Sequence, residues 1–179
     1  AFTGREVLVL GAGGFTLSHR ELANRYTYVD VDPAIRALAE ERFLKEPIRG
    51  EFVVDDARRY VATTPRRFDA VVVDVFSDHH SIPAHLVTRE FWRDTRRVLA
   101  PDGVLLANLI LDSRLESAYA RNLLATVESV FGRCGVEVLY RDRPLSNVEL
   151  ICHAGGRPGS AQPYVDELNR ADLDQARMR

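Results

Sequence analysis

Short runs of apolar residues alternate along the chain with segments whose apolar positions recur at helical spacing. The short runs predict strands over residues 6–10, 26–30, 52–54, 68–74, 104–109, 136–140 and 148–153. The segments with helical spacing predict helices over residues 15–24, 33–44, 57–63, 86–99, 114–131 and 164–177. A chain in which strands and helices alternate favours a parallel sheet with helices on both faces.

Two features refine this fold. The run FDAVVVD at 68–74 is continuously apolar, which is typical of a central parallel strand covered on both faces. The last two predicted strands are separated only by residues 141–147, which is too short for a crossover helix, so we expect them to pair antiparallel. The sequence therefore predicts an α/β fold, a doubly wound Rossmann-like sheet with a C-terminal antiparallel strand pair.

The helix over 33–44 has clear sequence signals. Asp32 is a plausible N-cap and Pro33 suits the first helical position. Its expected apolar stripe consists of Ile35, Leu38, Ala39 and Phe43.

The composition narrows the function classes. The chain has 179 residues, of which 46% are hydrophobic and 28% charged, and a net charge of −2, as expected for one globular domain. It lacks the basic stripe that is typical of proteins that bind nucleic acid or membrane surfaces. No apolar run approaches the length of roughly 20 residues that a membrane span needs. We therefore expect neither nucleic acid nor membrane as a partner. Cys134 and Cys152 are expected to be reduced thiols in a cytoplasmic protein.

A glycine turn follows the first predicted strand, at Gly11, Ala12 and Gly13. It matches the start of a G-x-G-x-x-G dinucleotide fingerprint, but Thr16 occupies the third glycine position. The turn is also compatible with a tight strand-to-helix connection that binds nothing. A P-loop is excluded, because no Gly-Lys-Ser/Thr sequence follows.

Aspartates follow three successive predicted strands, where ligands bind in such sheets. They are Asp30, Asp32, Asp55, Asp56, Asp74 and Asp78. Asp32, Asp55 and Asp56 can be explained as helix caps. Asp30 has the spacing of a carboxylate that bonds ribose hydroxyls. The combined negative field would repel a pyrophosphate and attract a cation, which favours an S-adenosyl sulfonium over NAD.

Asp74 ends the most buried predicted strand. Partial desolvation there would raise its pKa and make it a better general base, although it could instead only bind ligand or orient a loop. The loop that follows, residues 75–83, is long for this position, which favours a functional role. Within it His79 could touch substrate, and a metal site is not expected. His19, His85 and His153 are interpreted as ordinary surface or core histidines.

An ordered series of motifs resembles a known family. VLVLGAGG, YVDVDP, VVDDARRYV, FDAVVVDVFSD and FWRDTRRVLAPDGVLLANL together resemble the spermidine synthase (polyamine aminopropyltransferase) family, in particular its bacterial spermidine-synthase-like group, over roughly residues 5–154. The resemblance implies the methyltransferase type of Rossmann-like sheet. It also implies transfer of the aminopropyl group of decarboxylated S-adenosylmethionine to a small cationic amine, with release of methylthioadenosine and without a metal.

The resemblance also implies roles for individual residues. The turn at Gly11, Ala12 and Gly13 would pass under the nucleoside, and Asp74 would deprotonate the attacking amine. The other nucleoside-binding residues would be Asp30 at the ribose, Val31 against the adenine face, and Asp56 and Ala57 at the adenine edge. Asp78 and His79 would contact the amine. We expect residues 1–154 to form the nucleoside-binding catalytic domain and 155–179 a linker with a helical tail, either frayed or contacting a partner.

The sequence departs from the family at the amine side. Gly14 stands where the family usually has an acidic residue, and the fifth strand ends in Ala107-Asn108-Leu109 instead of Q-x-E-S. An S-adenosylmethionine-dependent methyltransferase is therefore an alternative function, and a non-catalytic nucleoside-binding or interaction domain is another. A homodimer is compatible with each of these functions.

Overall fold

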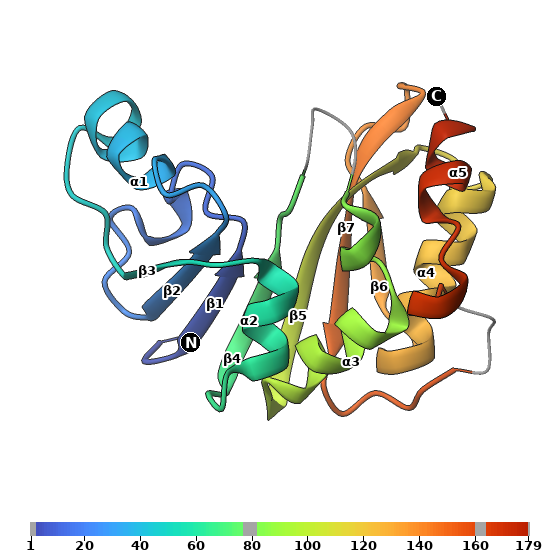
Figure 1. The fold of residues 1–179 in the computed structure, drawn as a ribbon, viewed down its shortest axis with the longest axis horizontal. Coiled ribbons are helices and arrows are strands. Elements are labelled where there is room, and N and C mark those ends of the chain that lie inside the picture. The colour runs from blue at the N-terminus through green and yellow to red at the C-terminus, as the bar shows by residue number, and fades with distance from the viewer. Residues whose placement is uncertain (1–2, 77–81, 160–163, 179) are drawn as a thin grey trace.

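The computed structural model describes residues 3–76, 82–159 and 164–178. One seven-stranded sheet runs through it in the order β3-β2-β1-β4-β5-β7-β6 (Figure 1). Strands β1 to β5 are parallel to one another, whereas β7 is antiparallel to both β5 and β6. The strands are β1 Glu6–Leu10, β2 Arg25–Asp30, β3 Glu51–Val54, β4 Phe68–Val73, β5 Leu99–Asp112, β6 Gly135–Val138 and β7 Leu145–His153. The predicted α/β fold with its closing antiparallel pair is confirmed.

The helices divide unequally between the two faces of the sheet (Figure 1). One face packs against α2 (Ala57–Thr63), α3 (Arg89–Arg97) and α4 (Ala118–Phe131). The other face is covered over β1 to β4 by the helix formed by α1 (Ile35–Leu38) and η2 (Ala39–Leu44) and by the chain around Phe15. The remaining short elements are η1 Thr16–Ser18, η3 Ala84–Leu86, η4 Asp166–Leu168 and α5 Ala171–Ala176. Among the described residues, none of these helices is long and apolar enough to cross a membrane.

Strand β4 is buried on both faces, as its sequence predicted. Val71 and Val73 belong to the core beneath α3 and α4, whereas Ala70 belongs to the core on the opposite face. The two cores therefore meet at the strand that leads to Asp74. Burial of apolar surface contributes roughly 25 cal/mol per Å², so this double burial fixes the position of the strand end.

The predicted helix over residues 15–24 is wrong. Only the single turn η1 forms there, because Phe15 and Arg20 adopt left-handed backbone conformations with φ of 55° and 60°. Phe15 is instead buried against Tyr28, with ring centroids 4.7 Å apart, and against Phe52. The segment thus covers the sheet with one aromatic anchor rather than with a helical face.

The helix over 33–44 forms, but its predicted apolar stripe is only partly correct. Asp32 accepts a hydrogen bond from the Ala34 backbone N–H at 2.9 Å, and regular helix begins at Ile35. Ala39 is buried, whereas Leu38 and Phe43 are 50% and 65% exposed. The Phe43 ring nevertheless lies against Gly14, where an added Cβ would be 2.8 Å from the ring.

The C-terminal segment is not a frayed tail. Tyr164 and Ala171 are buried with the core, and the Tyr164 hydroxyl donates to Asp174 at 2.8 Å. Asn122 of α4 donates to the same carboxylate at 3.1 Å. Residues 164–178 therefore pack on the helical layer.

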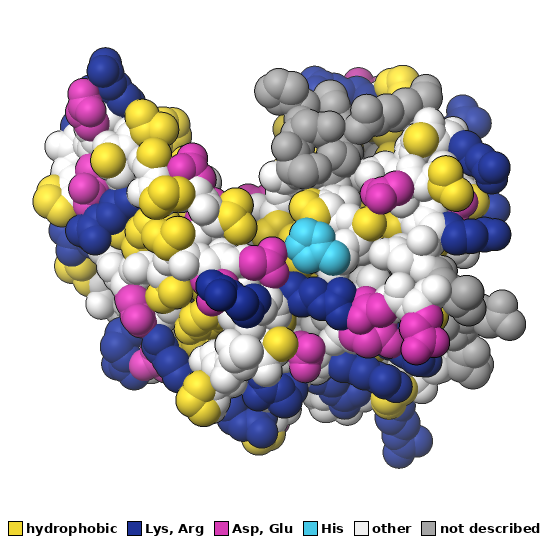
Figure 2. Space-filling model, in the orientation of Figure 1, with side chains coloured by type: hydrophobic (Ala, Val, Ile, Leu, Met, Phe, Trp, Pro, Cys, Tyr) yellow, Lys and Arg dark blue, Asp and Glu magenta, His cyan; other side chains and the backbone are white. Residues whose placement is uncertain are grey.

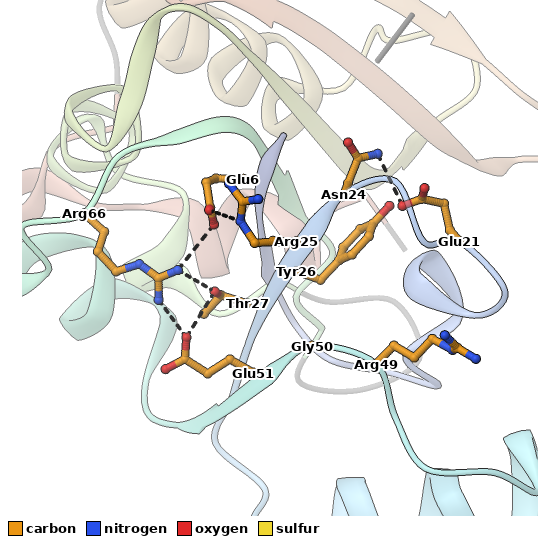
Figure 3. A pocket seen from close by; sticks show the side chains of 10 residues that line it. All are labelled: Glu6, Glu21, Asn24, Arg25, Tyr26, Thr27, Arg49, Gly50, Glu51 and Arg66. Carbon is orange, nitrogen blue, oxygen red and sulfur yellow. Dashed lines mark hydrogen bonds and ion pairs between the residues drawn. The ribbon is translucent and has the colours of Figure 1, made fainter. Parts of the chain in front are cut away.

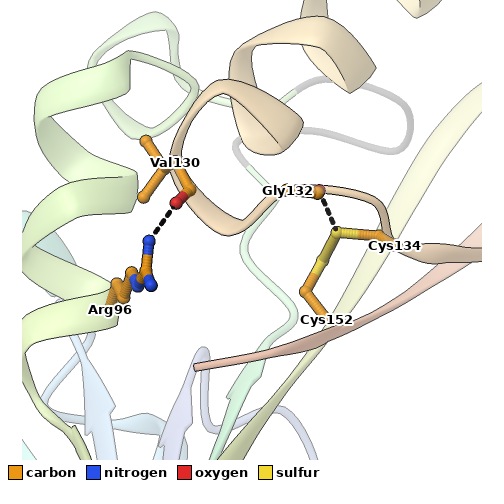
Figure 4. The surroundings of a disulfide bond; sticks show 5 residues. All are labelled: Arg96, Val130, Gly132, Cys134 and Cys152. Carbon is orange, nitrogen blue, oxygen red and sulfur yellow. Dashed lines mark hydrogen bonds between the residues drawn. A yellow bond between two sulfur atoms is a disulfide. The ribbon is translucent and has the colours of Figure 1, made fainter. Parts of the chain in front are cut away.

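Cys134 and Cys152 form a disulfide, so the expectation of reduced thiols is wrong (Figure 4). The antiparallel pairing places Gly135 opposite Ile151, which brings the two neighbouring cysteine Cα atoms to 4.6 Å. Nearby, Arg96 of α3 donates to the carbonyls of Val130, Ala154 and Gly156. Arg96 thus joins α3 to α4 and to the chain after β7, and the disulfide joins the loop after α4 to β7.

Replacing both cysteines by serine should lower the free energy of unfolding by about 3 kcal/mol, since the cross-link closes a loop of 18 residues. Denaturant unfolding of the two proteins, with and without reductant, measures this difference. Alkylation of the native protein followed by mass spectrometry is the direct check. Two freely alkylated cysteines in the native state would contradict the disulfide.

Candidate functional site

A cavity of about 450 Å³ opens at the carboxyl ends of β1, β2, β3 and β4. Figure 2 shows this face of the molecule hollowed beside the α1 region, with acidic and apolar side chains at the floor. The cavity is lined by Gly11, Gly13, Val29, Asp30, Val31, Ile35, Asp55, Asp56, Ala57, Asp74, Val75, Phe76, Pro83, His85 and Leu86. The structure thus brings together seven of the predicted site residues: Gly11, Gly13, Asp30, Val31, Asp56, Ala57 and Asp74.

Gly11 forms the floor of this cavity at the point where β1 meets β4. The Leu10 carbonyl accepts the Asp74 backbone N–H, and the Gly11 N–H donates to the Val29 carbonyl, both at 2.9 Å. The φ of Gly11 is +89°, and an added Cβ would lie 2.1 Å from the Asp74 carbonyl oxygen. Only glycine fits, because the turn passes directly against the end of β4.

Asp30 supports the glycine turn as well as lining the cavity. One of its oxygens accepts the Ala12 backbone N–H at 2.8 Å, and the other accepts the Asp32 N–H at 3.0 Å. Ala12 itself is buried and does not line the cavity. Its contribution to the site is therefore the backbone N–H that orients Asp30.

Asp56 lies on the opposite wall and pairs with His85. It caps α2 by accepting the Arg59 N–H at 3.0 Å, and its second oxygen lies 3.1 Å from His85 Nε2. Burial raises the pKa of Asp56, but the hydrogen bonds from Arg59 and His85 and the charge of His85 outweigh burial and hold that pKa below its usual value. His85 was interpreted from sequence as an ordinary histidine. Its place in the cavity depends on the turn after Pro83, which no local pattern reveals.

Asp74 lines the cavity directly after β4. Asn108 Nδ2 donates to its Oδ1 at 2.9 Å, and Asn147 Nδ2 donates to Asn108 Oδ1 at 2.8 Å. The side chain of Asp74 is exposed, so the desolvation expected from sequence is wrong. What distinguishes Asp74 is its orientation by a chain of two amides, of which Asn147 was not predicted from the sequence.

The remaining predicted site residues, Asp78 and His79, lie outside the described part of the chain, and their roles remain predictions. Within residues 3–76, 82–159 and 164–178, no group of three or more His, Cys, Asp or Glu side chains is arranged to hold a metal ion.

The wall formed by Pro83, His85 and Leu86 is braced by the C-terminal segment. Asn169 Nδ2 donates to the Ala84 carbonyl at 2.7 Å. Arg58 Nη1 donates to the His85 carbonyl at 3.1 Å and to Asp166 Oδ1 at 2.8 Å. These contacts join the segment after residue 163 to the candidate site. This connection was not predicted from the sequence.

A second cavity, of about 370 Å³, lies at the opposite, amino ends of β1, β2 and β3 (Figure 3). Its charges neutralise one another: Arg66 pairs with Glu51 at 2.7 Å, and Arg25 pairs with Glu6 at 2.5 Å. Because these groups satisfy each other, we assign no ligand to this cavity.

If the cavity binds the nucleoside that the sequence predicts, replacing Gly11 by alanine should abolish that binding. The left-handed backbone alone costs about 1–2 kcal/mol for a residue with a Cβ, and the added carbon would displace the Asp74 carbonyl. Calorimetric titration with methylthioadenosine measures the effect. The matched control is Gly155→Ala, because a Cβ there meets no atom within 4 Å. Equal affinity in the two variants would contradict this description of the turn.

Replacing Asp166 by asparagine should weaken methylthioadenosine binding up to about fivefold, since partly exposed ion pairs contribute about 1 kcal/mol or less. The melting temperature should change by no more than a few degrees. Asp172→Asn, an exposed change in α5, serves as control. If both variants bind like the parent protein, the C-terminal segment does not support the cavity wall.

The sequence and fold match known proteins. A family model described as a methyltransferase domain matches residues 7–103, more than half of the chain. The polyamine aminopropyltransferase of Vibrio vulnificus (strain CMCP6) is 33% identical over 135 residues, which cover 70% of this chain and 43% of the relative. The probable polyamine aminopropyl transferase of Bifidobacterium longum (strain NCC 2705) is 31% identical over 177 residues, covering 96% of this chain and 38% of the relative.

The fold is also similar to a solved structure, a probable spermidine synthase from Corynebacterium glutamicum ATCC 13032. It superposes with a TM-score of 0.70 at 24% identity and covers 97% of this chain and 62% of that one. The similarity supports the predicted methyltransferase-type sheet, and the predicted resemblance to aminopropyltransferases is confirmed by the names of the relatives. The chain spans less than half the length of these two curated relatives. The chain belongs to the methyltransferase domain family, and its curated relatives include polyamine aminopropyltransferases.

Proposed function

We propose that this chain carries the donor site and the general base of an aminopropyltransferase. The observation that carries the proposal is the position of Asp74. It ends β4 at the edge of a cavity that also holds Asp30 and Asp56, and an amide orients its carboxylate. With Asp55, four carboxylates line this cavity, which favours a cationic ligand. The names of the relatives, polyamine aminopropyltransferases, support the same reaction.

The donor would be decarboxylated S-adenosylmethionine. Asp30 would accept hydrogen bonds from the ribose hydroxyls, as such a carboxylate does in related sheets. Val31 is 65% exposed beside it and offers an apolar surface to the adenine ring. Asp56 and Ala57 would lie at the adenine edge, where Asp56 Oδ2 and His85 are already paired. The sulfonium would then lie above Gly11, toward Asp74.

The chemistry is a direct displacement. The amine nitrogen forms a bond to the aminopropyl carbon beside the sulfonium, the carbon–sulfur bond breaks, and its electron pair leaves on the neutral thioether of methylthioadenosine. Asp74 takes the proton that the amine loses. Asn108 holds one of its oxygens, and no described residue hydrogen-bonds the other, which leaves it available to the proton.

A methyltransferase using intact S-adenosylmethionine is the second candidate. Gly14 favours it, because the acidic residue usual there in aminopropyltransferases would repel the carboxylate of the intact donor. The homodimer and the cytoplasmic location expected from the sequence remain predictions.

Calorimetry with the two donors distinguishes these candidates. We expect tighter binding of decarboxylated S-adenosylmethionine than of the intact form, together with binding of methylthioadenosine. A preference for the intact donor would favour the methyltransferase. If none of the three nucleosides binds at millimolar concentration, both enzymatic functions are wrong.

Replacing Asp74 by asparagine should lower aminopropyl transfer by about 10²–10⁴-fold, the usual contribution of a general base. Methylthioadenosine affinity should change little, since the nucleoside contacts involve other residues. Product formation followed by mass spectrometry measures the loss. Asp102→Asn is the control, because Asp102 is exposed near the start of β5, at the end of the sheet opposite Asp74. Unchanged turnover would remove Asp74 as the base.

A further inference from the structure

A third cavity, of about 360 Å³, lies between two turns at the carboxyl end of β5. One turn, residues 113–117, connects β5 to α4, and the other, residues 141–144, leads into β7. The Ser113 backbone N–H joins the two turns by donating to the Pro144 carbonyl at 3.1 Å. The cavity is lined by Asp112, Ser113, Arg114, Arg141, Asp142, Arg143 and Pro144.

This cavity is separate from the proposed donor cavity. No described residue lines both of them. The parallel register pairs Val73 with Ala107, so Asp74 lies at the level of Asn108. Asp112 is four residues further along β5, which is about 13 Å at the usual rise of a strand. A ligand held here would therefore not occupy the place of the donor.

Three arginines of this cavity have no partner in the described part of the chain. The guanidinium groups of Arg114, Arg141 and Arg143 form no hydrogen bond and no ion pair with any described residue. At the opposite end of the sheet, by contrast, Arg66 pairs with Glu51 at 2.7 Å. Positive charges that converge on a concave surface without neutralisation attract anions, and guanidinium groups bind carboxylates and phosphates in bidentate fashion.

The two carboxylates of the cavity do not pair with these arginines. Asp112 uses its oxygens inside its own turn, where it accepts the Glu116 backbone N–H at 2.8 Å and the Ser117 backbone N–H at 3.1 Å. Asp142 forms no ion pair with a described residue. Three guanidinium groups against two carboxylates leave the cavity with a net positive charge.

Two further features supply ordered donors. The guanidinium carbon of Arg143 lies 4.5 Å from the centroid of the Tyr140 ring, a cation–π contact that restricts this long side chain. Ser113 is only 9% exposed, yet no described residue forms a hydrogen bond with its hydroxyl. A buried hydroxyl without a partner is unfavourable. An anion in the cavity would accept a hydrogen bond from this hydroxyl.

We propose that this cavity binds a small molecule that carries a diphosphate group. A phosphate presents three acceptor oxygens and a carboxylate only two, so phosphates better satisfy three guanidinium groups and a hydroxyl. Arg114 lies on one turn and Arg141 and Arg143 lie on the other, and two linked phosphates can reach both turns. The concave shape and the net charge of −2 of the chain favour a small anion over a nucleic acid. The inference does not rest on the proposed function.

Calorimetric titration of the full chain with sodium pyrophosphate tests this site. Low ionic strength is used because salt screens exposed charges. The parent protein should bind pyrophosphate more tightly than citrate, an anion whose charges are all carboxylates. The double variant Arg141→Gln/Arg143→Gln should bind pyrophosphate at least about tenfold more weakly, since it loses two charge-assisted contacts. Ser113→Ala should weaken binding by about threefold to tenfold.

Two further variants make the outcome specific. Arg93→Gln, an exposed change on α3 outside the cavity, should bind pyrophosphate like the parent. Arg143→Lys keeps the charge but not the planar fork, and its affinity should lie between those of the parent and the double variant. Melting temperatures within a few degrees of the parent show that the variants are folded.

Equal pyrophosphate affinity of the double variant and the parent would overturn this inference. Tighter binding of citrate than of pyrophosphate would overturn it as well, and so would failure of the parent to bind pyrophosphate at millimolar concentration. None of these results bears on the proposed function, which methylthioadenosine binding tests separately.

Discussion

The close approach of the Gly11 turn to the end of β4 determines the rest of the site. Parallel pairing of β1 with β4 and β2 places the glycine turn between Asp74 and Asp30. The turn can pass there only because residue 11 has no Cβ. The same turn presents the Ala12 N–H that orients Asp30, and the Leu10 carbonyl that fixes the Asp74 backbone. One steric constraint thus sets the relative positions of Asp30 and Asp74, the carboxylates proposed to bind the nucleoside and to act as the base.

The cavity at this site is bounded by strand ends, by the turn at residues 84–86 and by α2, and the C-terminal segment braces one wall. Asp74 and its Asn108 partner lie where β4 meets β5, at the edge of this cavity.

The sequence predicted the strands, the sheet class and most of the cavity, because these depend on local signals. Apolar runs locate the strands, and residues after parallel strands converge at one edge of the sheet. It failed where long-range contacts decide the outcome. Phe15 is anchored by Tyr28 instead of continuing a helix, and Cys134 reaches Cys152 only through the β6–β7 register. His85 and Asn147 enter the site through turns and strand pairings that no short motif encodes. Asp74, directly after β4, is exposed although Val73 and Val75 on either side of it are buried.

The most direct measurement is a crystal structure of the chain soaked with methylthioadenosine. The account predicts that the ribose hydroxyls lie within hydrogen-bonding distance of Asp30, that the adenine lies against Val31 with its edge at Asp56, and that the thioether sulfur points toward Asp74. A nucleoside bound outside this cavity, or bound in it with the sulfur directed away from Asp74, would contradict the account.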